Sequence, residues 1–201
     1  MAEKPILFNG EMVRAILDGR KTQMRRPMKN QPQPVVVPGL GPVLAIDQPH
    51  SPNRWLWPNA REEVVASCPF GKPGDLLWVR ESYQRFSEDG EILYMADSNS
   101  WEEMNQLKCE GDPEAHWRPS IHMPRWACRI VLEITDVRVE RLQAISERDA
   151  IAEGVGSAIT RDCKVPKFAA LWDQLHGAGA WHANPWVWVI DFTRVEDNRH
   201  G

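Results

Sequence analysis

Several patterns that identify large protein classes are missing from this sequence of 201 residues. Its four cysteines, at positions 68, 109, 128 and 163, form neither a C-x-x-C metal knuckle nor a compact disulfide framework. No apolar run has the length of a membrane span, and the N-terminus has no signal-peptide core. The glycine motifs G-x-G-x-x-G and G-x-x-x-x-G-K-[ST] are also missing. We therefore expect reduced thiols, a cytoplasmic location without membrane contact, no metal, no cofactor, and neither a Rossmann nor a P-loop fold.

The chain also lacks the positive charge of a general nucleic-acid coat, since its net charge is -4. The charges are unevenly distributed, however. Residues 14–29 hold six basic residues against the single acid Asp18, whereas residues 88–114 hold nine acids against the single base Lys108. A basic site and an acidic region on one domain predict a polarised surface that steers an anionic ligand to one face.

The basic residues are concentrated in one short stretch, Gly19–Pro27, with the sequence G-R-K-T-Q-M-R-R-P. Gly19 can take a left-handed backbone that ends the preceding helix, and Pro27 prevents further regular pairing. The segment between them is expected to be extended or looped, with its cations free to converge on an anion. An isolated basic run is often only a solvated turn.

The mixture of side chains in this stretch favours a binding site over a solvated turn. Lys21 and Thr22 stand beside each other, and the pair Arg25 and Arg26 follows closely. An arginine can hold phosphate through two parallel N–H donors, so both arginines are candidate phosphate ligands. A partly buried Lys21 beside a carboxylate would form either a proton-transfer pair or a structural ion pair.

Local patterns predict short strands over the whole chain and three helices at its margins. Asn9 is expected to cap a helix over residues 10–18, and Ser146 to cap a second helix that ends before Gly154. A third helix with one apolar face is expected to end at Gly177. The segments expected to form strands are 6–8, 35–37, 43–46, 55–57, 76–83, 92–95 after a turn at 89–90, 128–134, 136–140 and 186–192. This arrangement indicates an α+β fold built on a small mixed β-barrel.

The order of these motifs resembles the ASCH domain family of the PUA-like superfamily. The motifs that carry the resemblance are a strand and short helix before G-R-K-T-x-x-R, the G-D-x-L-x-V strand at 74–79, two long strands at 128–140, a short helix carrying a glutamate, and the apolar strand at 186–192. The stretches 6–27, 73–81 and 117–126 look most like the longer phage- and prophage-encoded members. The resemblance implies one PUA-like domain over residues 1–201, with insertions at about 28–70 and 97–124.

For function, the resemblance implies a pocket on one side of the barrel that binds nucleic acid or a modified nucleoside. Some small bacterial ASCH proteins are amidohydrolases acting on acetylated cytidine. They use a lysine in the G-R-K-T motif, a threonine three residues later, and a glutamate on the helix after the long strands. Lys21 and Glu153 match the lysine and the glutamate, which implies catalytic roles for both. Met24 stands at the threonine position, where a thioether cannot replace a nucleophilic hydroxyl. Thr22 lies nearby.

Two further segments hold candidate ligand-binding residues. The strand from residue 76 changes from apolar to charged at Arg80 and Glu81, which are either site-edge residues or a cross-strand pair. Trp117 and Trp126 flank a loop that also holds His122 and Arg125, and they are candidate stacking platforms for bases. His122 is expected to make a local hydrogen bond or to contact the ligand. Its irregular spacing from other potential ligands argues against a metal site.

Three functional hypotheses follow. The first is a module that binds RNA, single-stranded nucleic acid or a modified nucleoside through a basic pocket of Lys21, Arg25, Arg26 and neighbouring aromatic residues. The second is an enzyme, either an amidohydrolase on an acylated cytidine-type base or a nuclease. The third is a phage-related protein-interaction factor that uses the acidic region at 88–114.

Overall fold

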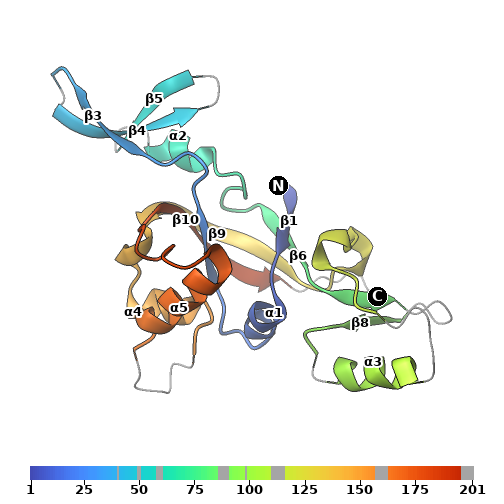
Figure 1. The fold of residues 1–201 in the computed structure, drawn as a ribbon. Helices are drawn as coiled ribbons and strands as arrows, with labels where there is room; N and C mark the ends of the chain where they lie inside the picture. The colour runs from blue at the N-terminus through green and yellow to red at the C-terminus, as the bar shows by residue number, and fades with distance from the viewer. Residues whose placement is uncertain are drawn as a thin grey trace.

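The computed structural model describes residues 1–39, 41–48, 51–57, 61–85, 91–97, 99–109, 116–156 and 163–195. These residues form an α+β fold in which short helices flank a mixed five-stranded sheet (Figure 1). The predicted α+β class is confirmed. None of the helices in the described residues has both the length and the apolar character needed to cross a bilayer.

The main sheet has the strand order β1 (Glu3–Leu7), β6 (Leu76–Arg80), β9 (Val131–Arg141), β10 (Trp186–Val195), β2 (Gln23–Pro27). β1 and β6 run parallel, and every other neighbouring pair is antiparallel. One face of this sheet carries the largest group of buried apolar side chains, to which all five strands contribute. The sheet therefore provides the frame on which the helices and loops are placed.

The sheet is open rather than a closed barrel, which corrects the predicted architecture. Within the described residues no hydrogen-bonded ladder joins its edge strands β1 and β2. The two edges nevertheless approach each other, because Nη2 of Arg26 in β2 donates to the carbonyl of Leu7 at the end of β1 at 2.8 Å. The sheet is therefore strongly curved, and one side chain spans the gap between its edges.

β9 corrects a second prediction, since it is one continuous strand where two were expected. Asp136 pairs with Asp191 of β10, whereas Ile134 pairs with the next residue, Phe192, so that Thr135 has no partner. This irregularity is a β-bulge, which bends a strand without ending it. Thr135 and Asp136 are consecutive exposed residues, so the alternation of buried and exposed side chains breaks at this point. A bulge and a gap between two strands look the same in the sequence.

The three predicted helices are confirmed as α1 (Gly10–Leu17), α4 (Glu147–Ala152) and α5 (Val165–His176). The side chain of Asn9 caps α1, and a capping box begins α4. Gly19 follows α1 with a φ of +70°, the left-handed backbone expected for it. The short-range hydrogen bonds that start and stop these helices are therefore encoded locally.

The remaining elements form two small sheets and two further helices. They are β3 (Gln33–Val37), β4 (Gly41–Gln48) and β5 (Ser51–Trp57) in one antiparallel sheet, β7 (Tyr83–Arg85) and β8 (Ile92–Tyr94) in another, the helices α2 (Arg61–Ala66) and α3 (Ser100–Cys109), and single 3₁₀ turns at Ser120–His122, Arg125–Ala127 and Leu142–Ala144. The strands expected near residues 35, 44 and 56 are confirmed, and their sheet projects from the main body (Figure 1). The turn expected at 89–90 lies outside the described residues.

One expected strand is shorter than predicted, and one helix was not predicted. The strand expected over 76–83 ends at Arg80, because the chain leaves the main sheet and starts again at Tyr83 in β7. The helix α3 was not expected at all. Its segment is acidic and holds few apolar residues, of which Met104 is buried while Trp101 stays half-exposed. A helix with so little apolar periodicity gives no clear signal in the sequence.

Candidate functional site

The end of α1 folds the basic stretch against the end of α4. The carbonyl of Ala15 accepts hydrogen bonds from the backbone N–H groups of Arg20 at 2.8 Å and Lys21 at 2.9 Å, which reverses the chain around Gly19. Lys21 then pairs with Glu153 in an isolated β-bridge. Glu153 is the C-cap residue of α4. Two residues that are 132 positions apart are thereby brought into direct contact.

Gly154 makes this approach possible. Its φ is +86°, a conformation that strains any residue with a side chain. A Cβ atom at this position would lie 2.9 Å from the Cβ of Ala15 and 3.1 Å from the Cβ of Lys21. Gly154 therefore ends α4 and also leaves room for the basic stretch to pass beside it.

The ammonium group of Lys21 is buried, and its three donor positions are all used. Nζ donates to the carbonyl of Gln23 at 2.9 Å, to the carbonyl of Glu153 at 2.8 Å and to Oε2 of Glu153 at 2.9 Å. Burial lowers the pKa of Lys21, although the charge and hydrogen bond of Glu153 oppose this shift. In this geometry Lys21 holds Glu153 in place and has no donor left for an anion.

Arg25 is equally inaccessible, with no exposed side-chain surface. Its Nη1 donates to Oε1 of Glu153 at 3.2 Å and to the side chain of Gln23. Its Nη2 lies 3.5 Å from carboxylate oxygens of Glu140 and Asp149. The expectation that Arg25 is free to hold a phosphate is therefore wrong, because three carboxylates of the protein already surround it.

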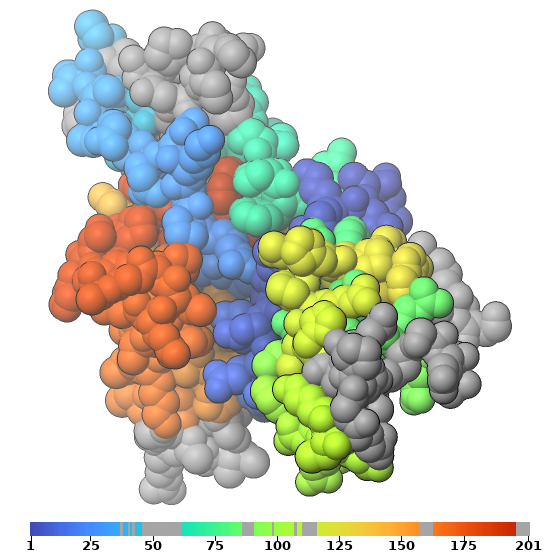
Figure 2. Space-filling model, turned by 45° about the vertical axis from the view of Figure 1, so that its right-hand side comes forward, coloured from blue at the N-terminus to red at the C-terminus, as the bar shows by residue number. Residues whose placement is uncertain are grey.

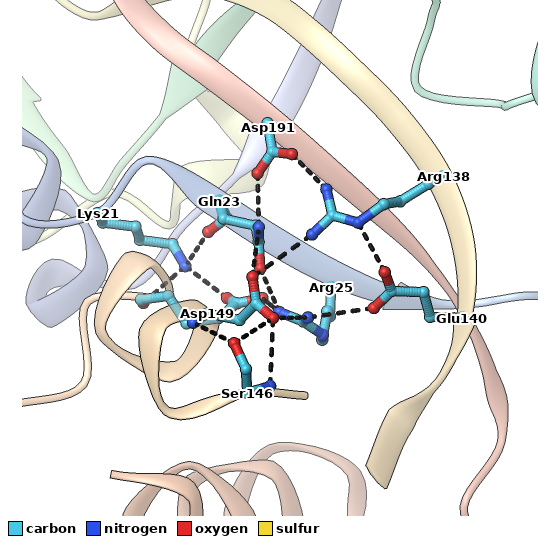
Figure 3. Close-up of polar contacts among 9 residues, drawn as sticks. Lys21, Gln23, Arg25, Arg138, Glu140, Ser146, Asp149 and Asp191 are labelled. Carbon is cyan, nitrogen blue, oxygen red and sulfur yellow. Dashed lines mark hydrogen bonds and ion pairs between the residues drawn. The ribbon is translucent and has the colours of Figure 1, made fainter. Parts of the chain in front are cut away.

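A polar network extends this cluster across the sheet (Figure 3). Gln23 donates from Nε2 to Asp191 at 2.5 Å and to Asp149 at 3.3 Å. Arg138 contacts both of these aspartates and donates from Nε to Glu140 at 2.7 Å. The charged members are the cations Lys21, Arg25 and Arg138 and the carboxylates Glu140, Asp149, Glu153 and Asp191. Lys21 and Arg25 of the basic stretch are thus neutralised by carboxylates of the chain rather than presented to solvent.

Asp149 joins this network to the start of α4. Its Oδ2 accepts hydrogen bonds from the backbone N–H of Ser146 at 3.2 Å and from the Ser146 hydroxyl at 2.7 Å. Burial acts to raise the pKa of Asp149, but these hydrogen bonds and the charge of Arg25 outweigh it, so the pKa is lowered. The helix cap and the ion network therefore depend on the same ionised carboxylate.

A narrow pocket opens beside this network, between β2 and α5. The residues that line it are Phe8, Met12, Lys21, Met24, Arg25, Arg26, Glu153, Phe168, Leu171, Trp172, Leu175 and His176. Its cavity volume is about 30 Å³. The walls are mostly apolar or aromatic, and the charged groups lie together on one side. Met24, at the position where the resemblance implies a threonine, lines this same pocket and is buried.

Three of the lining residues carry buried N–H donors that have no hydrogen-bond acceptor in the described part of the chain. They are Nε of Arg25, Nε of Arg26 and Nε1 of Trp172. A buried donor without a partner costs about 1–3 kcal/mol. A ligand that supplies acceptor atoms at this wall would recover part of that cost.

Arg26 is the cation of this pocket whose charge is least compensated. Beyond its bond to the carbonyl of Leu7, its guanidinium lies 5.7 Å from the centre of the Phe8 ring. No ion pair to Arg26 occurs among the residues that the structure describes, whereas Lys21 and Arg25 both have them. Of the two predicted phosphate ligands, only Arg26 remains able to contact a ligand.

The aromatic wall of the pocket was missed in the sequence. Phe168 and Trp172 were assigned only to the apolar face of α5, and His176 was not singled out. The rings of Trp172 and His176 lie 4.2 Å apart, and burial together with the charge of Arg26 lowers the pKa of His176. The apolar face was visible in the sequence, but the element against which it packs was not.

Glu81 and Arg80, which were also expected at the site, lie elsewhere. Both oxygens of Glu81 accept from Arg129, at 2.9 and 3.0 Å, and Arg129 also binds Asp97 through two bonds of 2.8 Å. Burial raises the pKa of Glu81, while Arg129 opposes the shift. Arg80 contacts the carbonyl of Ile121 in the 117–127 segment. The structure therefore does not bring Glu81 into contact with Lys21.

The four predicted residues of the 117–126 loop are also outside the pocket. Trp117 is half-buried and packs edge-on against Trp101 at 5.8 Å, so it does not offer an open face. Arg125 forms an ion pair with Glu3 at 2.7 Å. His122 and Trp126 are exposed. Of the two tryptophans proposed as stacking platforms, only Trp126 presents an accessible ring.

Thr22 lies beside the site but points away from it. Its backbone N–H donates to the carbonyl of Ala152 at 2.8 Å and its carbonyl accepts from Phe192 at 2.9 Å, while the residue is exposed. Thr22 is exposed, whereas Lys21, Gln23 and Met24 are buried. Its hydroxyl does not take the place of the one that Met24 lacks.

No group of potential metal ligands occurs among the described residues. Comparisons of the chain with protein-family models, curated proteins and solved structures find no match.

Proposed function

We propose that this protein is a member of the ASCH group of PUA-like domains and that its pocket binds a nucleobase. The base would belong to RNA, to single-stranded nucleic acid or to a modified nucleoside. The observation that carries the proposal is a pocket with aromatic sides in whose lining Arg26 and Trp172 each hold a buried N–H donor without an acceptor among the described residues. A nucleobase matches this wall, because it is flat, has apolar faces and carries acceptor atoms along its edge.

The charge distribution favours a base over a phosphate as the chemical group that occupies the pocket. Lys21 and Arg25 are already neutralised by carboxylates of the chain, and Glu153 adds an acceptor to the same side of the pocket. A phosphate would be repelled by Glu153 and would find only Arg26 in reach. A neutral base can accept from Arg26 and Trp172 and donate to Glu153.

Binding requires a small movement, because the pocket is narrower than a base. Leu175 and His176 lie at the exposed end of α5, and the long side chain of Arg26 can rotate away from Leu7. Rotamer changes of this kind are common at binding sites whose backbone stays in place. The buried Lys21–Glu153 pair would keep the floor of the pocket fixed during this movement.

The experiment compares two arginines from the same basic stretch. Arg26 lines the pocket, whereas Arg20 is on the surface and pairs with Asp18 at 2.8 Å. Calorimetric titration with a panel of plain and modified nucleosides, including acetylated cytidine, should identify a ligand. Arg26→Gln should then weaken its binding roughly 10-fold or more, as expected for loss of a hydrogen bond from a charged donor. Arg20→Gln should stay within about two-fold of the wild type.

A thermal melt of each variant should accompany the titrations, because Arg26 also bridges the two edges of the sheet. If no nucleoside and no oligonucleotide binds to the wild type, the proposal is wrong. Equal losses in Arg20→Gln and a folded Arg26→Gln would place the binding site outside the pocket.

A second candidate function is hydrolysis of an acylated cytidine-type base. It is favoured by the contact between Lys21 and Glu153 in the wall of the pocket, with Met24 beside them. Burial lowers the pKa of Lys21 and so makes the neutral amine more accessible for proton transfer. The missing component is a hydroxyl nucleophile at position 24, so we place this activity second.

A further inference from the structure

A separate patch of exposed side chains lies outside the pocket. Trp126 is 52% exposed and Ile121 is 55% exposed, both in the 117–127 segment. The guanidinium of the exposed Arg85 lies 5.1 Å from the centre of the Trp126 ring. We call Arg85, Ile121 and Trp126 the aromatic platform.

The backbone beneath the platform is held firmly. Arg118 and Tyr83 exchange backbone hydrogen bonds of 2.9 and 3.2 Å, and the hydroxyl of Tyr94 donates to the carbonyl of Ala127 at 3.0 Å. Met123 is 1% exposed and packs with Tyr83 in a small core of its own. The exposure of the Trp126 ring is therefore a property of an ordered segment that is anchored from both sides.

Besides Arg85, further basic side chains lie beside the platform. Arg80 donates to the carbonyl of Ile121, and Arg118 donates to Gln84, the neighbour of Arg85. His122 and Arg125 are the chain neighbours of Ile121 and Trp126. Within the described residues, Arg125 is the one of these basic side chains that forms an ion pair, and its partner is Glu3. An exposed indole ring among arginines is suited to single-stranded nucleic acid, whose bases stack on aromatic rings while its phosphates attract cations.

The platform is joined to the pocket through the end of β1. Arg26, which lines the pocket, donates to the carbonyl of Leu7 at 2.8 Å. Leu7 pairs with Arg80 in the neighbouring strand, and the guanidinium of Arg80 in turn donates to the carbonyl of Ile121 in the platform. Figure 2 shows the blue N-terminal segment between the orange α5 and the yellow 117–127 segment. A single-stranded nucleic acid only a few nucleotides long could therefore contact both the pocket and the aromatic platform.

We propose that the aromatic platform is a second contact for a single-stranded nucleic acid whose base occupies the pocket. This inference rests on the proposed function and narrows its ligand to a strand rather than a free nucleoside. A neighbouring base stacks on Trp126, and Arg85 and Arg80 contact the phosphates between the two positions. A free nucleoside uses the pocket alone.

The test measures fluorescence anisotropy of labelled mixed-sequence 12-nucleotide RNA and DNA, in parallel with calorimetric titration of the nucleoside panel. Trp126→Ala should weaken oligonucleotide binding roughly 5- to 150-fold, the range for losing one base–aromatic stack. It should leave nucleoside binding unchanged. Arg85→Gln should reduce the slope of log K against log salt by about 0.7, as expected for one phosphate contact to a single strand.

Trp101→Ala is the matched control, since Trp101 is also an exposed tryptophan, at 44%, but lies on the acidic helix α3. It should bind oligonucleotides like the wild type. If a folded Trp126→Ala also binds like the wild type while Arg26→Gln loses binding, the platform inference is wrong and the pocket proposal stands. If the wild type binds neither oligonucleotides nor nucleosides, both are wrong.

Discussion

Replacing Lys21 by methionine would show whether the buried Lys21–Glu153 pair serves structure alone. Methionine has a similar length and no charge, so the change removes the ammonium group with little change in volume. Glu153 would then be left with Arg25, 3.2 Å from its Oε1, and without the shorter contact of 2.9 Å to Lys21. Both side chains of the pair are almost fully buried, at 1% and 5% exposure, so water cannot take the place of the missing partner.

We expect Lys21→Met to lower the free energy of unfolding by about 3–5 kcal/mol, the usual cost of removing one partner of a buried ion pair. Glu153→Gln should cost less, because the amide oxygen can still accept from Lys21 and two backbone carbonyls still hold the ammonium group. In the double variant neither charge of the pair remains. Its loss should therefore be smaller than the sum of the two single losses by about 0.5–3 kcal/mol.

The assay is urea unfolding of the four proteins at pH 7, followed by circular dichroism. The same comparison at rising pH adds an independent check. The pKa of Lys21 is lower in the folded state than the ordinary value of 10.5. Between the two values the unfolded chain binds more protons, so the stability of the wild type relative to Lys21→Met should increase as the pH rises through this window.

Losses below about 1 kcal/mol in both single variants would contradict this reasoning, because they would mean that the pair is neither buried nor strongly coupled. Strictly additive losses would contradict it as well. If Lys21→Met is instead fully folded and stable but no longer binds the nucleoside that the wild type binds, the Lys21–Glu153 pair contributes to ligand binding rather than to the stability of the fold.

Two further predictions concern residues beside this pair. Met24→Thr should give turnover of acetylated cytidine that the wild type lacks, with Met24→Val as the control of equal shape without a hydroxyl; a stability loss of about 2 kcal/mol is expected for both. Equal activity of the two variants by liquid chromatography would exclude the hydroxyl as the nucleophile. Gly154→Ala should lower the free energy of unfolding by about 1–3 kcal/mol more than Gly177→Ala, because both have positive φ but a Cβ at Gly177 meets no atom within 4 Å. Similar losses of unfolding free energy in the two variants, measured by chemical denaturation, would show that the close contact with Lys21 does not determine the cost of a side chain at Gly154.

Features with short-range causes could be predicted from the sequence. The caps at Asn9 and Ser146 and the helix-ending glycines Gly19 and Gly154 depend on hydrogen bonds and backbone angles within a few residues. The α+β class followed from the mixture of such local patterns. A β-bulge at Thr135 could not be distinguished from a break between strands, because the bulge is defined by the pairing of β9 with β10, which is distant in the sequence.

The sequence by itself determined that cations, a reversing glycine and an apolar helix face would occur in this order. Only the tertiary structure decided which of the cations are available to a ligand. Arg25 and Arg26 are neighbours and both line the pocket, yet Arg25 is paired with three carboxylates, whereas no ion pair to Arg26 occurs among the described residues. The carboxylates come from β9 and from the region of α4, more than 100 positions away. Electrostatic neutralisation acts through space, so the charge that a residue presents cannot be read from its neighbours in the chain.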